Sequence, residues 1–316
     1  MICELAAGAC QTTKQTVHRP HPKGNRMNRG IPALLVLALA TAAGVAKHGV
    51  QASAPGPTER KAGEEAKVIV FADDFETGDL SRWDELRYEK HIGVTSDAAG
   101  VHSGKHGMEI RFEEGNNGGE AIKWFMPGYD EVYARWYFKL EPGFDMGNGM
   151  HGMILMGNRP DNRWSGFGTA GTKPDGTNFW VANVDPVTFW EKYPNPGAFC
   201  FYSYWPDMKL DTKTGKYWGN YFWQQEPALL IEPGRWHELV FHVKLNTVGK
   251  KDGLQELWID SERKLRVEGL RWRAVPELTI NTLWVCSWTK APKPQRLWLD
   301  DITVSTRPFP PAKPSR

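Results

Sequence analysis

The segment Val132–Gly157 reads VYARWYFKLEPGFDMGNGMHGMILMG, and the fold expected for this chain follows from it. Apolar and polar side chains alternate over its first nine residues, and this period of two predicts a half-buried strand. A turn signal at Pro142 and Gly143 comes next, then a glycine-rich bend and a second apolar run at Met153–Met156. The segment therefore predicts two strands joined by a turn.

The polar face of the first strand carries two aromatic rings and two cations: Tyr133, Arg135, Tyr137 and Lys139. Aromatic rings stack on sugars and cations pair with carboxylates, so this face could hold an acidic glycan. Alternatively, these side chains only cover apolar surface, since tyrosine and long basic residues are also good strand formers. His151, at the mouth of the second strand, is either a proton-transfer group or a structural histidine.

The composition indicates one large, strand-rich domain. A chain of 316 residues can bury a large core, and all-β sandwiches of roughly 200–250 residues form a single domain. The 15 tryptophans, 32 glycines and 22 prolines favour a strand-rich, carbohydrate-facing protein. The formal net charge of +2 does not indicate a nucleic-acid partner. The sequence also lacks a GxxxxGK[ST] loop and a GxSxG elbow, which removes the main support for phosphate-binding and serine-hydrolase functions.

The N-terminal region predicts export. Residues 31–46, IPALLVLALATAAGVA, follow two arginines and precede a small-residue Ala-Ser-Ala site. This order is typical of a secretory signal, and the alternative is a retained membrane anchor. We expect a secreted or periplasmic protein with no membrane contact after signal cleavage. The predicted organisation is an N-terminal extension with signal peptide over 1–54, a linker over 55–67, a β-domain over 68–306 and a flexible tail over 307–316.

Two cysteines, Cys200 and Cys286, lie inside apolar strand patterns. They could form one disulfide in an oxidising compartment or remain two buried thiols, and the sequence leaves both possibilities open. Cys3 and Cys10 precede any plausible mature start.

Strand-length segments separated by turn signals recur along the domain. In the clearest one, Leu239, Phe241 and Val243 share one face, and a turn with Asn246 and Gly253 leads back into the next strand. This pattern predicts a two-layer antiparallel β-sandwich. Strands are expected near residues 108–112, 132–140, 152–156, 179–183, 198–205, 236–245, 254–259, 283–288 and 297–304.

Acidic residues gather at both ends of the domain, with Asp73, Asp74 and Glu76 near its first strand and Asp300 and Asp301 in its last. Carboxylates in neighbouring strands are costly unless something neutralises them, and a hard cation bound by oxygens would do so. Calcium is the natural candidate. The alternative is that these acids are solvated at strand ends.

Four segments together look like a known family: DDFETGDLSRW, YARWYFKLEPGFD, PGRWHELVFHVKLNTVGKKDGLQELWID and LWLDDITVS. They resemble the concanavalin A-like jelly rolls of secreted polysaccharide lyases, chiefly of the alginate lyase and glucuronan lyase type, over most of Val68–Ser305. The resemblance implies an all-β, two-sheet antiparallel jelly-roll sandwich. It also implies a structural calcium ion that joins the first and last strands. The matching positions are Glu76, the loop from Ser103 to Lys105, and Asp300.

The resemblance further implies a groove in which a uronate is cleaved by β-elimination. Arg135 matches the strand arginine of the family and would hold the substrate carboxylate. His151 would act as the base, and Tyr202 or Tyr204 as the acid. We expect an acidic polysaccharide as the partner and a monomer in solution. The residues expected to line the subsites are Tyr133, Tyr137 and Lys139, with His242 as a reserve base.

One departure from the alginate lyase pattern bears on the chemistry. Where those enzymes carry Gly-Gly-Lys-Leu-Pro, this chain reads Asn-Gly-Met-His-Gly at 148–152, so the lysine is missing. Either His151 performs the proton transfer, as in the glucuronan-cleaving relatives, or the domain is a non-catalytic carbohydrate-binding module of the same fold. A glycoside hydrolase is the third alternative. It ranks last because such an enzyme needs two carboxylates that face each other across the groove, and no strand shows two acidic residues at i and i+2 on a polar face.

Overall fold

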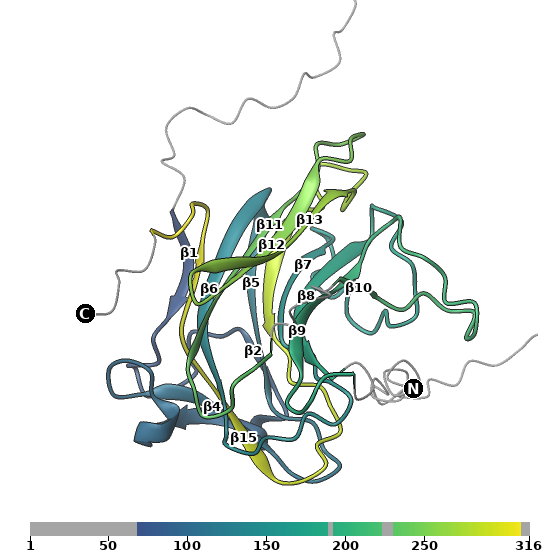
Figure 1. The fold of residues 1–316 in the computed structure, drawn as a ribbon. Coiled ribbons are helices and arrows are strands. Elements are labelled where there is room, and N and C mark those ends of the chain that lie inside the picture. The colour runs from purple at the N-terminus through teal and green to yellow at the C-terminus, as the bar shows by residue number, and fades with distance from the viewer. Residues whose placement is uncertain (1–67, 189–191, 223–229, 311–316) are drawn as a thin grey trace, which may run out of the picture. The chain divides into compact units, whose positions relative to one another are not determined.

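The computed structural model describes residues 68–188, 192–222 and 230–310, which build two antiparallel β-sheets (Figure 1). Sheet A has the order β13-β12-β11-β6-β15-β4-β3, and β1 pairs with β15 beside this path. Its strands are β1 (Ile69–Asp73), β3 (Ile92–Thr95), β4 (Gly107–Phe112), β6 (Glu131–Leu140), β11 (His237–Lys244), β12 (Gly253–Ile259), β13 (Glu262–Leu270) and β15 (Gln295–Ser305).

Sheet B has the order β10-β9-β8-β7-β14-β5-β2. Its strands are β2 (Glu85–Arg87), β5 (Glu120–Tyr129), β7 (Met153–Asn158), β8 (Phe179–Val187), β9 (Ala198–Tyr204), β10 (Asn220–Phe222) and β14 (Ile280–Val285). The described residues contain no α-helix, only the 3-10 turns η2 (Glu89–His91) and η3 (Ala98–Gly100). The expected all-β, two-sheet antiparallel fold is confirmed.

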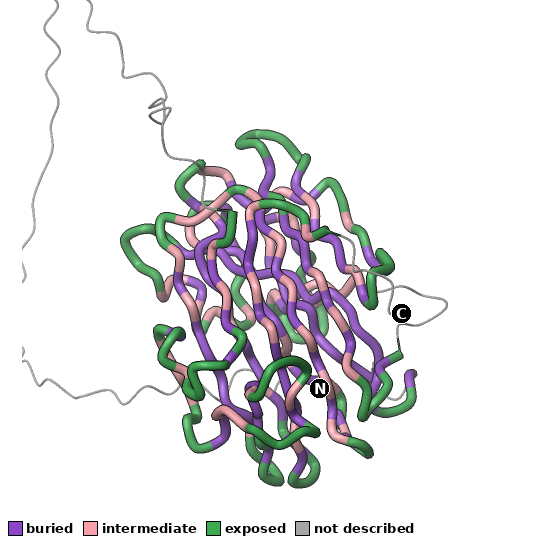
Figure 2. Tube along the Cα trace, turned by 90° about the vertical axis from the view of Figure 1, so that its left-hand side faces the viewer, coloured by how far each residue is buried: buried purple, intermediate pink, exposed green. Residues whose placement is uncertain are grey.

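The core lies between the sheets and is built by alternate residues of each strand. On β6, Val132, Trp136 and Phe138 are buried in the core cluster, while their neighbours in sequence are partly exposed. Phe241 on β11 meets Phe201 on β9 across the core, with ring centroids 5.5 Å apart. Figure 2 shows how burial varies along the chain: residues in the middle of the domain are mostly buried or intermediate, and the connecting turns at its ends are exposed. Each fully buried large apolar side chain contributes about 1.5–3 kcal/mol to folding.

Two long strands, β5 and β13, were not expected from the sequence. β13 reads ERKLRVEGL and has few apolar residues. It forms an edge of sheet A, where charged side chains discourage pairing with another chain. β5 reads EAIKWFMPGY and contains a Pro-Gly pair, which in a sequence is read as a turn.

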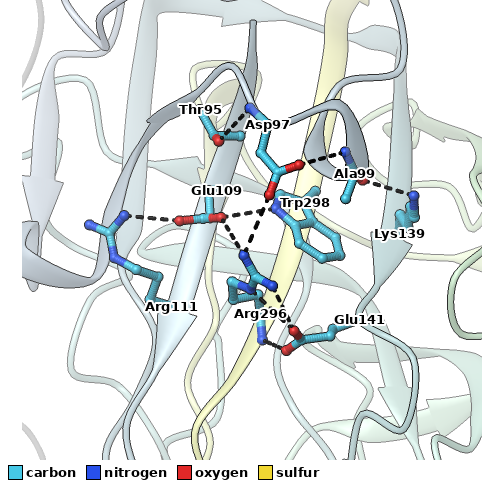
Figure 3. A network of polar contacts seen from close by, with 9 residues as sticks. All are labelled: Thr95, Asp97, Ala99, Glu109, Arg111, Lys139, Glu141, Arg296 and Trp298. Atoms are coloured by element: carbon cyan, nitrogen blue, oxygen red, sulfur yellow. Dashed lines mark hydrogen bonds and ion pairs between the residues drawn. The ribbon is translucent and has the colours of Figure 1, made fainter.

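The outer face of sheet A carries a network of ion pairs (Figure 3). Arg296 on β15 lies 2.9 Å from Glu141 and 3.7 Å from Glu109, and Glu109 accepts a hydrogen bond from the indole N–H of Trp298 at 3.1 Å. Lys139 on β6 donates to the carbonyl oxygen of Ala99 at 2.8 Å. These charges therefore satisfy one another on the sheet.

Cys200 and Cys286 are buried free thiols, which decides the alternative left open by the sequence. Cys200 lies on β9 and Cys286 follows β14, and β8 and β7 stand between these two strands. Three strand spacings amount to about 14 Å, whereas disulfide-linked Cα atoms lie within about 7 Å. The sheet thus keeps the two sulfurs apart.

The predicted extension and signal peptide at 1–54 and the linker at 55–67 lie outside the described residues. Within the described part, no helix is long and apolar enough to cross a membrane. Of the predicted tail, residues 307–310 are described, and the ring of Phe309 lies 4.5 Å from the guanidinium of Arg135 on β6.

Candidate active site

The outer face of sheet B, which points away from the core, carries a cleft of about 170 Å³. Side chains from six strands of the sheet line the cleft, and the loop that holds residues 166–170 forms part of its wall. The cleft contains His151, Tyr202 and Tyr204, three of the four residues expected to be catalytic.

Strand register places the polar side chains of the cleft in two neighbouring rows across sheet B. In one row Ile154 on β7 pairs with Asn183 on β8, and Asn183 pairs with Tyr202 on β9. In the other row Arg87 on β2 pairs with Glu120 on β5. Because side chains at paired positions share a face, residues far apart in the sequence converge here.

His151 lies just before β7 and is held by Asp185 on β8. Its Nδ1 lies 2.8 Å from one carboxylate oxygen of Asp185, and the other oxygen accepts the backbone N–H of Gly152 at 3.0 Å. The side chain of Asp185 is buried, whereas 24% of the His151 side chain is exposed. Because the carboxylate accepts the proton on Nδ1, the neutral imidazole keeps its lone pair on Nε2.

Two opposing effects set the pKa of His151. Burial lowers it, but the charge and the hydrogen bond of Asp185 raise it, and the carboxylate of Glu120 adds to them. The net result is a pKa above the ordinary value for histidine. The imidazole is therefore suited to accept a proton and to hold it.

Two phenols from β9 lie beside this imidazole. The ring of Tyr202 stacks on the ring of His151 with centroids 5.5 Å apart. The hydroxyl oxygens of Tyr202 and Tyr204 lie 3.2 Å apart, so one phenol donates a hydrogen bond to the other. A proton donor is thus present next to a proton acceptor.

Asn183 presents an unsatisfied amide to the same part of the cleft. The residue is buried, and its Oδ1 accepts no hydrogen bond from any described residue. Such a buried polar atom costs about 1–3 kcal/mol unless a ligand or water satisfies it. The Nδ2 group of the same amide carries two N–H donors, with which this cleft residue could bind a carboxylate.

Arg87 forms the cationic end of the cleft. Its guanidinium carbon lies 5.1–5.8 Å from the ring centroids of Trp164, Phe167 and Trp284. Cation–π contacts position a guanidinium without neutralising its charge. The cation can therefore attract an anionic ligand.

Glu120 is a buried carboxyl group on the cleft wall. Its Oε2 accepts the indole N–H of Trp284 at 3.2 Å, and its Oε1 lies 3.6 Å from the Sγ of Cys286. Burial raises the pKa of Glu120 to about 7, although the nearby guanidinium of Arg87 opposes this rise. The group is thus partly protonated at neutral pH.

The structure does not bring Arg135 to this cleft. Arg135 lies on β6 in the middle of sheet A, between β11 and β15, and alternates with the core residues of that strand. His151 belongs to sheet B, so the core separates the two side chains. The expectation that Arg135 and His151 line one groove is therefore wrong. A period of two shows that a strand has a polar face, but it does not show which sheet the strand joins.

The outer face of sheet A also carries the four residues expected to bind substrate: Tyr133, Tyr137, Lys139 and His242. Each of them already contacts a neighbouring residue of the protein. The ring of His242 stacks on Tyr133 at 4.0 Å, and its two nitrogens each lie 2.8 Å from a carboxylate, Glu131 on one side and Glu256 on the other. The ring of Tyr137 is covered by His102 with centroids 3.5 Å apart. The expectation that these residues line the same groove as His151 is therefore wrong.

The residues expected to hold calcium meet at one loop. Glu76 accepts the backbone N–H groups of Lys105 and His106 at 2.7 and 2.9 Å, and Asp300 accepts those of His102 and Ser103 at 2.8 and 3.2 Å. Burial raises the pKa of Asp300 to about 6, which a nearby cation would reverse. Among the described residues, however, no three acidic, His or Cys side chains are grouped to hold a metal. A calcium ion here would need backbone carbonyl ligands, and the site stays a prediction.

Four cleft residues were not found by sequence reasoning. Asn183 and Asp185 did leave a signal, because they alternate with Ala182 and Val184 in one strand, but that strand was expected to end at residue 183. Arg87 comes from a three-residue strand and left no signal. Glu120 begins β5, the strand that was missed.

No protein-family model matches the sequence, and no curated protein matches it. Solved structures do resemble it. An alginate lyase from Aplysia kurodai aligns with 76% of this chain and all of its own length at 14% identity and a TM-score of 0.59. An alginate lyase from Chlorella virus aligns with 76% of this chain and all of its own at 16% identity and a TM-score of 0.58.

The endo-beta-1,4-glucuronan lyase from the fungus Trichoderma reesei aligns with 76% of this chain and 96% of its own at 16% identity and a TM-score of 0.51. At such identities the likeness shows the fold. The jelly-roll fold expected from the sequence segments is therefore confirmed, and it is the fold of these polysaccharide lyases.

Proposed function

We propose that the chain is a polysaccharide lyase that cleaves a uronic-acid-containing polysaccharide by β-elimination in the sheet B cleft. The observation that carries this proposal is the convergence of His151, Tyr202 and Asn183, which supplies a proton acceptor, a proton donor and an unsatisfied amide. These are the groups that the reaction requires, since it removes a carbon-bound proton beside a carboxylate and expels an alkoxide. The fold shared with alginate and glucuronan lyases supports it.

In the proposed reaction Asn183 binds the C6 carboxylate and stabilises the charge that develops when the C5 proton leaves. The lone pair on Nε2 of His151 takes that proton, and Asp185 stabilises the resulting imidazolium. The electron pair forms the C4–C5 double bond, and the bond from C4 to the glycosidic oxygen breaks. Tyr202 protonates the departing oxygen, and Tyr204 holds the phenol through their hydrogen bond. Proton exchange with solvent then restores both groups.

Arg87 has a different task, because it sits at the end of the cleft among aromatic rings. A guanidinium there would bind the carboxylate of a neighbouring sugar and would favour a polyanionic chain over a neutral one. The acidic polysaccharide partner is therefore part of the proposal. Export of the chain is also part of it, since residues 31–46 have the pattern of a secretory signal.

The test is to incubate the purified protein with alginate, with glucuronan and with a neutral glucan, and to follow ultraviolet absorbance from the unsaturated product. Absorbance that grows with one of the uronates and not with the glucan is the expected result. New reducing ends without absorbance would instead show hydrolysis. Binding of a polymer without either signal would show a carbohydrate-binding module and would end the catalytic proposal.

A further inference from the structure

Glu120 lines the cleft, but the proposed reaction gives it no role. The cleft offered to an anionic sugar contains a buried carboxyl group of its own. Two like charges in a water-poor site repel each other strongly, so this residue either opposes uronate binding or changes its protonation state when the ligand arrives.

We propose that Glu120 takes up one proton when a uronate occupies the cleft, and that its neutral carboxyl group then donates a hydrogen bond to the ligand. This inference rests on the proposed function, because it assumes an anionic sugar as the ligand. It adds a binding residue to the cleft and makes proton uptake part of substrate recognition.

Glu120 lies in the cleft lining beside Arg87. It begins β5 directly opposite Arg87, so both side chains belong to the same row of the cleft. The indole N–H of Trp284 donates to Oε2 at 3.2 Å, and the thiol of Cys286, only a weak donor, donates to Oε1 at 3.6 Å. A proton on Oε1 would therefore be available to a stronger acceptor in the cleft, such as a sugar carboxylate.

Few charged groups surround Glu120. Arg87 faces it from β2, Cys286 from the segment after β14, and His151 from the segment before β7, with Asp185 behind that imidazole. The cleft wall at residues 166–170 adds no titratable group. One guanidinium is thus the only permanent cation among the described residues that line the cleft. It cannot balance both a ligand carboxylate and an ionised Glu120.

Glu120 holds its proton more readily than an ordinary carboxyl group. Burial already raises the pKa of Glu120 to about 7, so its proton is easily gained near neutral pH. A ligand carboxylate nearby raises that pKa further, because like charge disfavours ionisation. Above about pH 7, binding therefore requires a proton from solvent, and the affinity falls by up to about tenfold for each pH unit.

The experiment is calorimetric titration at pH 7.5 in two buffers of different ionisation enthalpy, which counts the protons taken up on binding. The ligands are the alginate trisaccharide and the glucuronan trisaccharide. The protein is the His151→Ala variant, in which cleavage is slowed by about 10²–10⁴-fold and no imidazole at this position can contribute a proton of its own. We expect an uptake of up to about three-quarters of a proton for each bound trisaccharide, because a carboxyl group with a pKa of about 7 is already about one-quarter protonated at pH 7.5. This uptake should be absent after the further change Glu120→Gln.

Glu109→Gln is the matched control, because Glu109 is also a buried carboxyl that accepts an indole N–H but lies on sheet A. Proton uptake should persist in that variant. Glutamine mimics the neutral form of Glu120, so the variant should fold, and a thermal melt checks that it does. Binding without proton uptake, or equal uptake with and without Glu120, would overturn the inference alone. Failure of both trisaccharides to bind, together with no lyase activity, would overturn the proposed function and this inference with it.

Discussion

The outer faces of the two sheets carry the same kinds of residue but differ in how those residues are satisfied. On sheet A, His242 has a carboxylate at each ring nitrogen and a tyrosine ring against its face. On sheet B, His151 has a carboxylate at Nδ1 and borders a cleft. A histidine beside tyrosines is therefore a candidate for chemistry only where its partners leave a lone pair exposed to a ligand.

The exchange of each histidine for alanine should show the largest difference between the two faces. His151→Ala should lower the lyase rate by about 10²–10⁴-fold, the usual contribution of a general base, with little change in the thermal melt. His242→Ala should leave the rate nearly unchanged but lower the melting temperature, because it leaves Glu131 and Glu256 without their shared partner. Loss of activity in the His242 variant and not in the His151 variant would move the site to sheet A.

The second test concerns the unsatisfied amide. Asn183→Leu should reduce kcat by about 10²–10³-fold, as loss of a group that stabilises developing charge does, and should not lower the thermal melt. Asn158 is the matched control, since its Nδ2 donates to the hydroxyl of Thr282 at 2.9 Å and its Oδ1 accepts the backbone N–H of Gly166 at 2.8 Å. Asn158→Leu should destabilise the fold by about 1–3 kcal/mol. A stable, fully active Asn183 variant would remove the amide from the mechanism.

The two arginines provide the third test. Arg87→Ala should raise KM for a uronate polymer about tenfold and weaken the dependence of KM on salt, because a cation that attracts the polyanion is lost. Arg135→Ala should leave kcat and KM unchanged, since this side chain lies on the outer face of sheet A beside Phe309. Steady-state kinetics at two ionic strengths separate these outcomes. A KM effect confined to the Arg135 variant would support the role in substrate binding that the sequence predicted for Arg135.

The pH profile should sharpen the role of Asp185. The base must be neutral to accept a proton, so the rate should rise as pH increases through the raised pKa of His151. Asp185→Asn removes the negative charge that raises this pKa, and the acid limb of kcat/KM should move to lower pH even if the maximal rate falls. An acid limb that stays in place would assign it to another group.

Calcium removal should give the smallest effect on activity. If Glu76 and Asp300 hold the predicted ion with backbone carbonyls, chelation should lower the melting temperature by several degrees, since a ligand at about 100 times its Kd stabilises the folded state by about 2.7 kcal/mol. The lyase rate below the melt should change little, because this loop belongs to sheet A rather than to the cleft. A melt unaffected by chelation and by added calcium would mean that these carboxylates only bind backbone amides.

The sequence predicted strands well where one face enters the core. The alternation around Phe138 and Phe241 has a physical cause, the burial of every second side chain, and both strands formed as expected. The sequence did not predict β13, whose charged residues suit an exposed edge, or β5, whose Pro-Gly pair does not end the strand. Alternation of apolar and polar residues indicates which side chains are buried, so it does not detect strands without a strong apolar face.

Of the four residues that the sequence predicted to be catalytic, three line the cleft and the fourth, Arg135, does not. His151, Tyr202 and Tyr204 meet because β7 and β9 flank β8 in sheet B. Arg135 was expected beside them because it matches the strand arginine of the family that the sequence resembles, but sheet membership depends on pairing between distant segments. Arg87 could not be found, since its place in the cleft results from pairing with β5 and from rings on a distant loop.

The separation of Cys200 from Cys286 has a practical consequence. Neither strand order nor packing in the described domain depends on an oxidised cross-link, since both sulfurs are reduced and enclosed. Recombinant production in an ordinary bacterial cytosol should therefore yield a correctly folded domain without an oxidising strain or a disulfide isomerase. Reducing agents can likewise be kept in every buffer used for the kinetic work.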